Sequence, residues 1–204
     1  MQHTITLYDY NHCPYCVRVH MLIKRKNIIS KTITLAYDDI KTPTEIYGKK
    51  VLPFIIKADN TILGESLDIV NYLDNIDNKP ILSDKNLTEE INSALRELRP
   101  NANKLYKPRM MQTNIADFST QGAKEYYENK FSKKNNESFE ESIKQTNSLL
   151  PIVQDNLDKI DKLLPNTTNF YGDIFSMADI HLFPTLRNLT VVKDLVFKDR
   201  LKKY

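Results

Sequence analysis

Two cysteines three positions apart are the residues best suited to chemistry in this chain of 204 amino acids. They are the only cysteines, and both belong to the pentapeptide His12-Cys13-Pro14-Tyr15-Cys16. At this spacing the two sulfurs can form a disulfide, and in a reducing compartment such a pair is more often catalytic than structural. The pattern therefore predicts thiol–disulfide chemistry.

The elements expected around the pair make the two sulfurs unequal. A strand over residues 4–8 alternates apolar and polar residues, and a helix is expected from Pro14 to Lys26 because proline suits a first helical turn. Cys13 then lies at the N-cap, where free backbone N–H groups and the helix dipole favour a thiolate. Cys16 lies one turn further in, where ionisation is less assisted. We expect Cys13 to attack and Cys16 to resolve the mixed disulfide.

A metal site is the competing interpretation, because His12 and His20 bring the number of possible zinc ligands to four. His20 follows Cys16 by four residues and could share a metal with it, whereas His12 precedes the helix and must fold back. The spacing favours redox chemistry over a metal site or two inert buried thiols. We interpret His20 as a helix-surface histidine and predict no metal.

Composition limits the classes of function. The chain is 41% hydrophobic and 27% charged, which is ordinary for a globular protein, and its net charge of +3 gives little support to nucleic-acid binding. There is no signal-like N-terminus and no run of 18 apolar residues. We therefore expect a cytoplasmic protein without a membrane partner. Lys24-Arg25-Lys26 is interpreted as a solvated helix end.

The organisation of the chain changes near residue 77. Residues 1–77 alternate strands and helices in a thioredoxin-like order, with further strands at 31–35, 54–57 and 61–63 and helices at 44–47 and 67–74. Residues 78–87 are polar, include Pro80 and are predicted to be a linker. Residues 88–204 show only helical patterns, at 88–107, 120–131, 138–164 with an interruption at Pro151, 178–189 and near the C-terminus. The sequence predicts an α/β thioredoxin-like domain followed by an all-α domain.

Two patterns in the second domain predict structure rather than chemistry. The first helix carries an apolar stripe at helical spacing, formed by Ile91, Leu95, Leu98, Ala102 and Leu105. Ser176 and Asp179 have the spacing of a capping box and indicate a helix start. We expect the stripe to form core.

Pro53 stands at the start of an apolar strand, where its missing N–H is tolerated. An ordinary edge proline is the plain alternative. In a thioredoxin-like fold, however, a proline here is expected to be cis and to lie beside the dithiol. The backbone of Leu52 could then pair with an extended peptide.

Glu65 and Ser66 precede a predicted helix, with Ser66 expected at the N-cap. A hydroxyl and free N–H groups suit a carboxylate, and the Glu65 carboxylate suits an ammonium group. Alone this is a common helix cap. Beside Cys13 and Pro53 it fits the free amino-acid end of glutathione.

The chain resembles the glutaredoxin 2 family, the two-domain glutaredoxins built like glutathione S-transferases, over nearly its whole length. In the first domain the matching residues are Tyr8-Asp9, the pentapeptide at 12–16, Lys50, Pro53, Glu65-Ser66 and Asp68-Ile69-Val70. In the second they are Ala102-Asn103-Lys104-Leu105, Pro108-Arg109, Phe118-Ser119-Thr120, Asp179-Ile180, Leu182-Phe183-Pro184 and Leu186-Arg187-Asn188-Leu189-Thr190. The matches in the helical domain are the more specific ones.

The resemblance implies a glutathione S-transferase-like architecture whose activity is glutathione-dependent thiol–disulfide exchange. Catalysis falls to Cys13 and Cys16. The implied glutathione contacts are Pro14, Tyr15, Lys50, Leu52, Pro53, Glu65 and Ser66, with Leu52 in place of the usual valine. No cofactor is expected to be bound permanently, since glutathione is a co-substrate. The implied partners are glutathione and glutathionylated or disulfide-bonded proteins, and we expect a monomer.

Two rival functions use the same architecture. A glutathione S-transferase would conjugate electrophiles with glutathione's own sulfur and would need no resolving cysteine. A non-catalytic glutathione-binding or iron–sulfur scaffold is the other, but cluster-binding glutaredoxins commonly replace the proline or the second cysteine. Pro14 and Cys16 argue against that scaffold.

Overall fold

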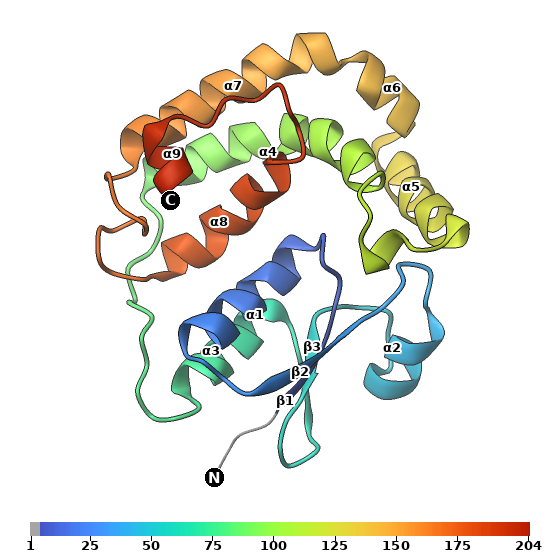
Figure 1. Ribbon diagram of the computed structural model, residues 1–204, viewed down its shortest axis with the longest axis vertical. Helices are drawn as coiled ribbons and strands as arrows, with labels where there is room; N and C mark the ends of the chain where they lie inside the picture. The colour runs from blue at the N-terminus through green and yellow to red at the C-terminus, as the bar shows by residue number, and fades with distance from the viewer. Residues whose placement is uncertain (1–4) are drawn as a thin grey trace. The chain divides into compact units, whose positions relative to one another are not determined.

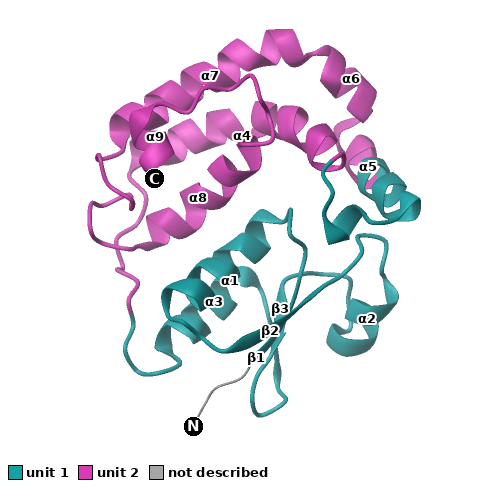
Figure 2. Cartoon of the chain, viewed as in Figure 1, with its two compact units in different colours: residues 1–80, 113–129 teal, residues 81–112, 130–204 magenta. Residues whose placement is uncertain are grey.

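A computed structural model describes residues 5–204, and the chain divides into two compact units (Figures 1 and 2). Unit 1 comprises the chain up to Pro80 together with Thr113–Asn129, and unit 2 comprises Ile81–Gln112 and Lys130–Tyr204. Residues 113–129 thus group with unit 1, although the sequence placed them in the helical domain. Within the described residues, no helix combines the length and apolar character needed to span a membrane.

Unit 1 is built on a four-stranded sheet of order β2-β1-β3-β4. The strands are β1 (Ile5–Asp9), β2 (Ser30–Thr34), β3 (Phe54–Ile56) and β4 (Ile62–Gly64). β1 pairs in parallel with β2 through a crossover helix, while β3 is antiparallel to both β1 and β4. The predicted thioredoxin-like order is confirmed, and only residue 4 of the expected first strand lies outside the described residues.

Three helices belong to this sheet. α1 (Pro14–Arg25) and α3 (Ser66–Asn75) pack against each other on one side, and α2 (Lys41–Tyr47) lies on the other (Figure 1). The fully buried Leu7 shares its face of β1 with Asp9, which contacts His20 of α1, whereas the ring of Phe54 stacks on Tyr8 and on Tyr47 of α2, at 4.6 and 5.3 Å between ring centroids. The C-terminal ends of β1 and β4 are therefore fixed from both sides.

The start of α3 differs from the prediction. Ser66 is the first helical residue, and Glu65 takes the N-cap position with φ +60°, in the left-handed region. The strand before it continues to Gly64, and the Tyr47 hydroxyl group packs there, 1.9 Å from where a Cβ at this residue would stand. The turn is thus displaced by one residue, so Ser66 as N-cap was wrong.

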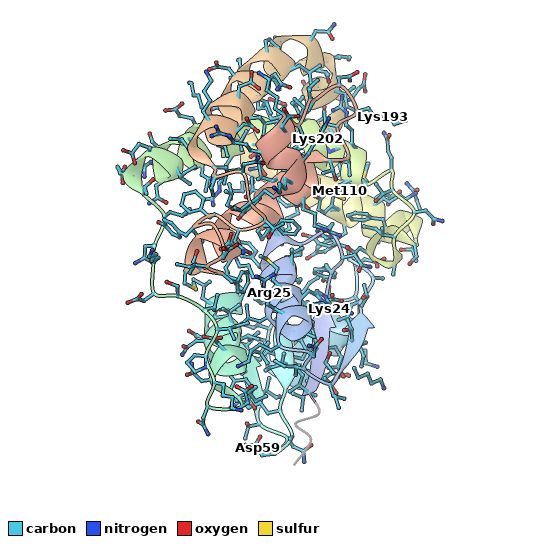
Figure 3. All side chains as sticks on the ribbon, turned by 60° about the vertical axis from the view of Figure 1, so that its left-hand side comes forward. Lys24, Arg25, Asp59, Met110, Lys193 and Lys202 are labelled. Carbon is cyan, nitrogen blue, oxygen red and sulfur yellow. The ribbon has the colours of Figure 1, made fainter. Side chains whose placement is uncertain are left out.

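Lys26 also departs from its predicted role at a solvated helix end. Its side chain is only 3% exposed, and its Nζ donates to Asp77 Oδ1 at 2.6 Å, to the Lys79 carbonyl at 3.1 Å and to the Asp74 carbonyl. Lys24 and Arg25, from the last turn of α1 (Figure 3), remain exposed. Lys26 therefore ties the end of α1 to the segment after α3.

The helices of the second half are α4 (Glu89–Met110), α5 (Gln121–Asn135), α6 (Phe139–Lys144), α7 (Thr146–Leu163), α8 (Met177–Leu189) and α9 (Asp199–Lys203). The core of unit 2 forms where α4 contacts α6, α7 and α8. All five residues of the predicted apolar stripe on α4 are buried, and Ser176 and Asp179 form the predicted capping box. Both predictions are confirmed.

The predicted helix over 138–164 is in fact two helices. It breaks at Gln145, which ends α6 and begins α7, and Pro151 lies inside α7. Lys104 donates to Gln145 Oε1 at 3.2 Å and to Glu137 Oε2 at 2.6 Å, which holds the junction against α4. Pro151 removes one backbone hydrogen bond near the start of α7 without ending the helix. The break at Pro151 was therefore wrong.

Candidate active site

Strand register brings the three predicted site segments to one edge of the sheet. Phe54 pairs with both Tyr8 and Gly64, so the turn after β1, the residues before β3 and the start of α3 leave the sheet side by side. The Leu52–Pro53 peptide bond is cis, as expected for this fold. The dithiol, Leu52-Pro53 and Glu65-Ser66 are thereby assembled within unit 1.

Cys13 is the N-cap of α1, as predicted, and its residue surface is 9% exposed. A hydrogen bond from the Cys16 thiol and others from the Cys16 and Tyr15 amides lower the pKa of Cys13 below its ordinary value, although burial opposes them. The helix terminus thus supplies the donors expected of it. Cys13 is the sulfur that ionises more readily.

Cys16 has the opposite environment. It is fully buried, and burial raises its pKa well above the ordinary value, as do its neighbour Cys13 and the charge of Asp9. The Tyr10 amide donates to Cys16 Sγ at 3.4 Å and acts against this rise. Cys16 therefore holds its proton, as a resolving thiol should before its step.

A His–Asp pair holds the turn before Cys13. His12 Nδ1 lies 2.5 Å from Asp117 Oδ2, and both side chains are buried. The same carboxylate accepts from the Asn11 amide at 2.9 Å and the His12 amide at 2.8 Å. Asp117 lies 105 residues beyond His12, and no sequence pattern marked it. It explains in part why residues 113–129 belong to unit 1.

Aromatic rings complete that attachment. The His12 ring lies 5.0 Å from Phe118, 5.1 Å from Tyr127 and 5.1 Å from Tyr37, measured between ring centroids. Tyr37 also donates its amide to the Asp117 carbonyl at 2.8 Å. The turn that carries Cys13 is consequently packed on a rigid aromatic cluster.

A second His–Asp pair lies on the Cys16 side. His20 Nε2 is 2.5 Å from Asp9 Oδ2, and Thr34 donates its hydroxyl to Asp9 Oδ1 at 2.7 Å. The His20 side chain is 32% exposed, while Asp9 is fully buried at the end of β1. The interpretation of His20 as a plain surface histidine was incomplete.

One ring nitrogen of each proposed metal-ligating histidine is therefore engaged by a carboxylate rather than directed at the cysteines. Across residues 5–204 there is no group of three or more His, Cys, Asp or Glu side chains arranged to hold a metal ion. The geometry favours redox chemistry at the dithiol.

The residues predicted to bind glutathione occupy varied settings. Tyr15 is exposed with the Arg18 guanidinium 4.9 Å above its ring, and Arg18 also donates to Ser66 Oγ at 3.3 Å. The Glu65 carboxylate lies 3.7 Å from Lys49 Nζ. These side chains supply cationic, anionic and hydroxyl groups around the edge that carries Cys13.

Lys50 and Leu52 show a different arrangement. The Lys50 amine lies 3.4 Å from the centroid of the Tyr126 ring and donates to the Tyr37 carbonyl at 2.6 Å. Leu52 is buried and precedes the cis peptide bond to Pro53, so its predicted role, pairing through its backbone, stays a prediction. The assignment of Lys50 as a glutathione contact stays a prediction.

Fold and dithiol together define the class of the protein: a thiol–disulfide oxidoreductase built on a thioredoxin-like unit. Residues 7–80 match the family model for the glutathione S-transferase N-terminal domain, and residues 90–204 match that for the glutaredoxin 2 C-terminal domain. Glutaredoxin 2 of Escherichia coli K12 is 38% identical over 200 residues, which cover 97% of this chain and 91% of that protein. The chain belongs to the glutaredoxin 2 family.

Solved structures agree with this assignment. Glutaredoxin 2 from Salmonella typhimurium, crystallised in complex with glutathione, has a TM-score of 0.92 and 36% identity, covering 98% of this chain and 90% of that one. A glutathione S-transferase of Ceriporiopsis subvermispora has a TM-score of 0.75 at 18% identity, covering 98% and 94%. This second likeness concerns the fold alone and confirms the predicted transferase-like architecture.

Proposed function

We propose that this glutaredoxin reduces glutathione mixed disulfides and protein disulfides through the Cys13 thiolate. The observation that carries the proposal is the opposite direction of the two pKa shifts, lowered for Cys13 and raised for Cys16. A thiolate is the attacking species in thiol–disulfide exchange, which suits Cys13. Cys16, which stays protonated, reacts only in the later resolving step.

The first cycle needs only Cys13. Its thiolate attacks the glutathione sulfur of a mixed disulfide, the substrate thiol leaves, and Cys13 carries glutathione. A second glutathione thiolate then attacks that sulfur, releases glutathione disulfide and restores Cys13. Cys16 takes no part in these two exchanges.

Protein disulfides require the second cysteine. Cys13 attacks one sulfur of the substrate and forms a mixed disulfide between the two proteins. Cys16 then attacks Cys13, which frees the reduced substrate and leaves the Cys13–Cys16 disulfide for glutathione to reduce. The two thiols lie on one helical turn, which suits this intramolecular step.

Glutathione itself would lie along the edge that carries the dithiol. Its cysteinyl backbone would pair with Leu52 before Pro53, and its γ-glutamyl end would meet Glu65 and Ser66. The helix N-terminus at Ser66 offers N–H groups to the γ-glutamyl carboxylate. The exposed ring of Tyr15 would border the bound tripeptide.

The test compares two serine variants in the turnover of a mixed disulfide between glutathione and a small thiol. Cys13→Ser is expected to abolish turnover, because serine cannot form the mixed disulfide. Cys16→Ser is expected to retain much of it but to lose direct reduction of a protein disulfide. Equal loss of mixed-disulfide turnover in both variants would contradict the division of roles.

A parallel assay with a chromophoric electrophile addresses the transferase alternative. Conjugation requires activation of glutathione's own sulfur, whereas the activating donors found here point at Cys13. We expect any conjugation to be slow and to survive Cys13→Ser. Fast conjugation independent of both cysteines would favour the transferase function instead.

The setting and partners are part of the same proposal. A dithiol that must return to its reduced state after each turnover suits a cytoplasmic protein supplied with reduced glutathione. We expect a monomer whose protein partners are glutathionylated or disulfide-bonded. Light scattering of the purified protein, and mass analysis of adducts trapped on Cys16→Ser, test these two points.

A further inference from the structure

We propose that Asp9 and His20 form a proton-accepting pair for Cys16, specific to the resolving step. The inference rests on the proposed function, because it concerns how Cys16 becomes a thiolate when it attacks the mixed disulfide on Cys13. It assigns a positioning and proton-transfer role to two residues outside the dithiol.

The need for such a pair follows from the burial of Cys16. Its sulfur is fully buried and retains its proton, yet it must lose that proton to become a nucleophile. Bulk water has no direct access to a sulfur with no exposed surface. A nearby group must accept the proton and have its own path to solvent.

Two contacts, one from β1 and one from α1, relate Asp9 and His20 to Cys16. The amide of Tyr10, the residue next to Asp9, contacts Cys16 Sγ at 3.4 Å, and the Asp9 charge is among the groups that act on Cys16. His20 follows Cys16 by one helical turn on the same face of α1 and contacts Asp9 at 2.5 Å. Its ring is one-third exposed, so the pair joins a buried carboxylate to solvent.

Tyr10 is the other polar side chain near Cys16 that could be considered. Burial raises the pKa of its hydroxyl above the ordinary value of 10.0, so no phenolate forms near neutral pH. Its hydroxyl also has no hydrogen-bond partner within residues 5–204. Tyr10 therefore contributes its amide to Cys16 and cannot take the proton.

The resolving step moves one proton and exchanges one disulfide bond for another. The Cys16 S–H bond breaks, and the proton passes to the Asp9 carboxylate, directly or through one bridging water, and then by way of His20 to solvent. The Cys16 sulfur forms a bond to Cys13 Sγ as the bond from Cys13 to glutathione breaks. Glutathione leaves as a thiolate and takes a proton from water, so Cys16 is oxidised, the glutathionyl sulfur is reduced and Cys13 remains in a disulfide.

Charge alone predicts the opposite effect, which makes the inference testable. As a fixed negative charge, Asp9 raises the pKa of Cys16 and opposes its ionisation. Replacing it with neutral asparagine would then speed the attack by Cys16. As a proton acceptor, Asp9 assists the attack, and the same replacement would slow it.

Reduced full-length protein is mixed with glutathione disulfide and quenched with acid at successive times. The masses of the products are then measured by mass spectrometry. Attack by Cys13 gives a glutathione adduct at a rate that rises with glutathione disulfide, and closure by Cys16 converts it to an internal disulfide at a constant rate. In Asp9→Asn we expect closure to slow by at least about tenfold, because a positioned acid–base group typically contributes about 10²–10⁴-fold. The rate of adduct formation should stay within about twofold of wild type, since Cys13 does not depend on the pair.

Two further variants keep the result interpretable. His20→Gln retains a hydrogen-bonding side chain but not a proton carrier, and it is expected to slow closure by a smaller factor. Asp59→Asn makes the same chemical change at the tip of the β3–β4 hairpin (Figure 3) and is expected to change neither step.

Unchanged or faster closure in Asp9→Asn with normal closure in His20→Gln would overturn the inference. Equal slowing of both steps would also overturn it, because that result indicates a structural disturbance rather than proton transfer. If wild-type protein forms no adduct, the proposed function fails, and the inference fails with it. If wild-type protein forms the adduct but neither Asp9→Asn nor His20→Gln changes the rate of closure, the proposed function stands and only the inference is overturned.

Discussion

The two sulfurs of the dithiol lie one helical turn apart, yet their surroundings differ in almost every respect. Cys13 lies at the N-terminal end of α1 among backbone donors. Asp117, from residues 113–129, holds the turn that precedes it. Cys16 is enclosed by the end of β1, and its neighbours are the Tyr10 amide and the Asp9–His20 pair. Each sulfur thus has its own His–Asp pair.

One short motif supports two chemical roles because the two His–Asp pairs are set differently. The pair on the Cys13 side is fully buried and fixes the backbone that presents the nucleophile. The pair on the Cys16 side reaches solvent through His20 and can exchange protons. Position on the helix decides which thiol ionises, and the buried carboxylates then separate structural support from proton transfer.

The largest effect is expected from Asp117→Ala, which removes the His–Asp pair on the Cys13 side. This change removes the buried carboxylate that lies 2.5 Å from the His12 ring and accepts from two backbone N–H groups. We expect the free energy of unfolding to fall by about 3–5 kcal/mol, as for loss of one partner of a buried pair. Urea unfolding followed by circular dichroism measures it.

The control for that prediction is Asp59→Ala, which removes an exposed carboxylate that also accepts a backbone N–H group, from Thr61. Its loss of stability should be much smaller. Asp117→Ala should also impair mixed-disulfide and protein-disulfide reduction together, because both begin at Cys13. Selective loss of protein-disulfide reduction alone would show that the two His–Asp pairs do not divide their roles as described.

A smaller effect is expected on the coupling between the two sulfurs. The hydrogen bond from the Cys16 thiol makes the largest contribution to the lowered pKa of Cys13. Cys16→Ala should therefore raise that pKa toward the ordinary value of 9.0. Since only the thiolate is alkylated, the midpoint of the pH–rate profile with iodoacetamide should move to higher pH. At pH 7 the alkylation of Cys13 should therefore be slower than in wild type.

Cys16→Ser is the matched control, because its hydroxyl can still donate to Cys13. Its midpoint should lie below that of Cys16→Ala. Identical midpoints in wild type and Cys16→Ala would mean that the amides of α1 alone set the acidity of Cys13. The Cys16 thiol would then make no contribution to the lowered pKa of Cys13.

Local sequence pattern was sufficient to predict where α1 begins and that Cys13 lies at its start. Pro14, the strand before it and the apolar spacing of α1 predicted an N-cap position, and the structure has Cys13 there. The order of strands followed from alternation and turn residues for the same reason. Such features depend on neighbours within a few residues.

The two carboxylates were beyond the reach of local pattern. Asp117 meets His12 across 105 residues, and nothing in its own segment distinguishes it from a surface aspartate. Asp9 was named only among the residues shared with the glutaredoxin 2 family, and its contact with His20 requires the packing of α1 on β1. The left-handed Glu65 likewise follows a strand end, Gly64, that lies against Tyr47 of α2. Tertiary contacts decided each of these.

The smallest predicted effect tests whether Tyr10 acts on Cys16 through its backbone alone. Its hydroxyl is buried without a hydrogen-bond partner within residues 5–204, so Tyr10→Phe removes an unsatisfied polar group. We expect stability to be unchanged or to rise by about 1 kcal/mol, whereas Tyr204→Phe, which loses a 2.9 Å bond to Asp179, should cost about 1 kcal/mol. Both disulfide exchange rates should match wild type, because the Tyr10 amide remains. Slower closure by Cys16 in Tyr10→Phe would assign the hydroxyl a part in proton transfer and weaken the case for Asp9 and His20.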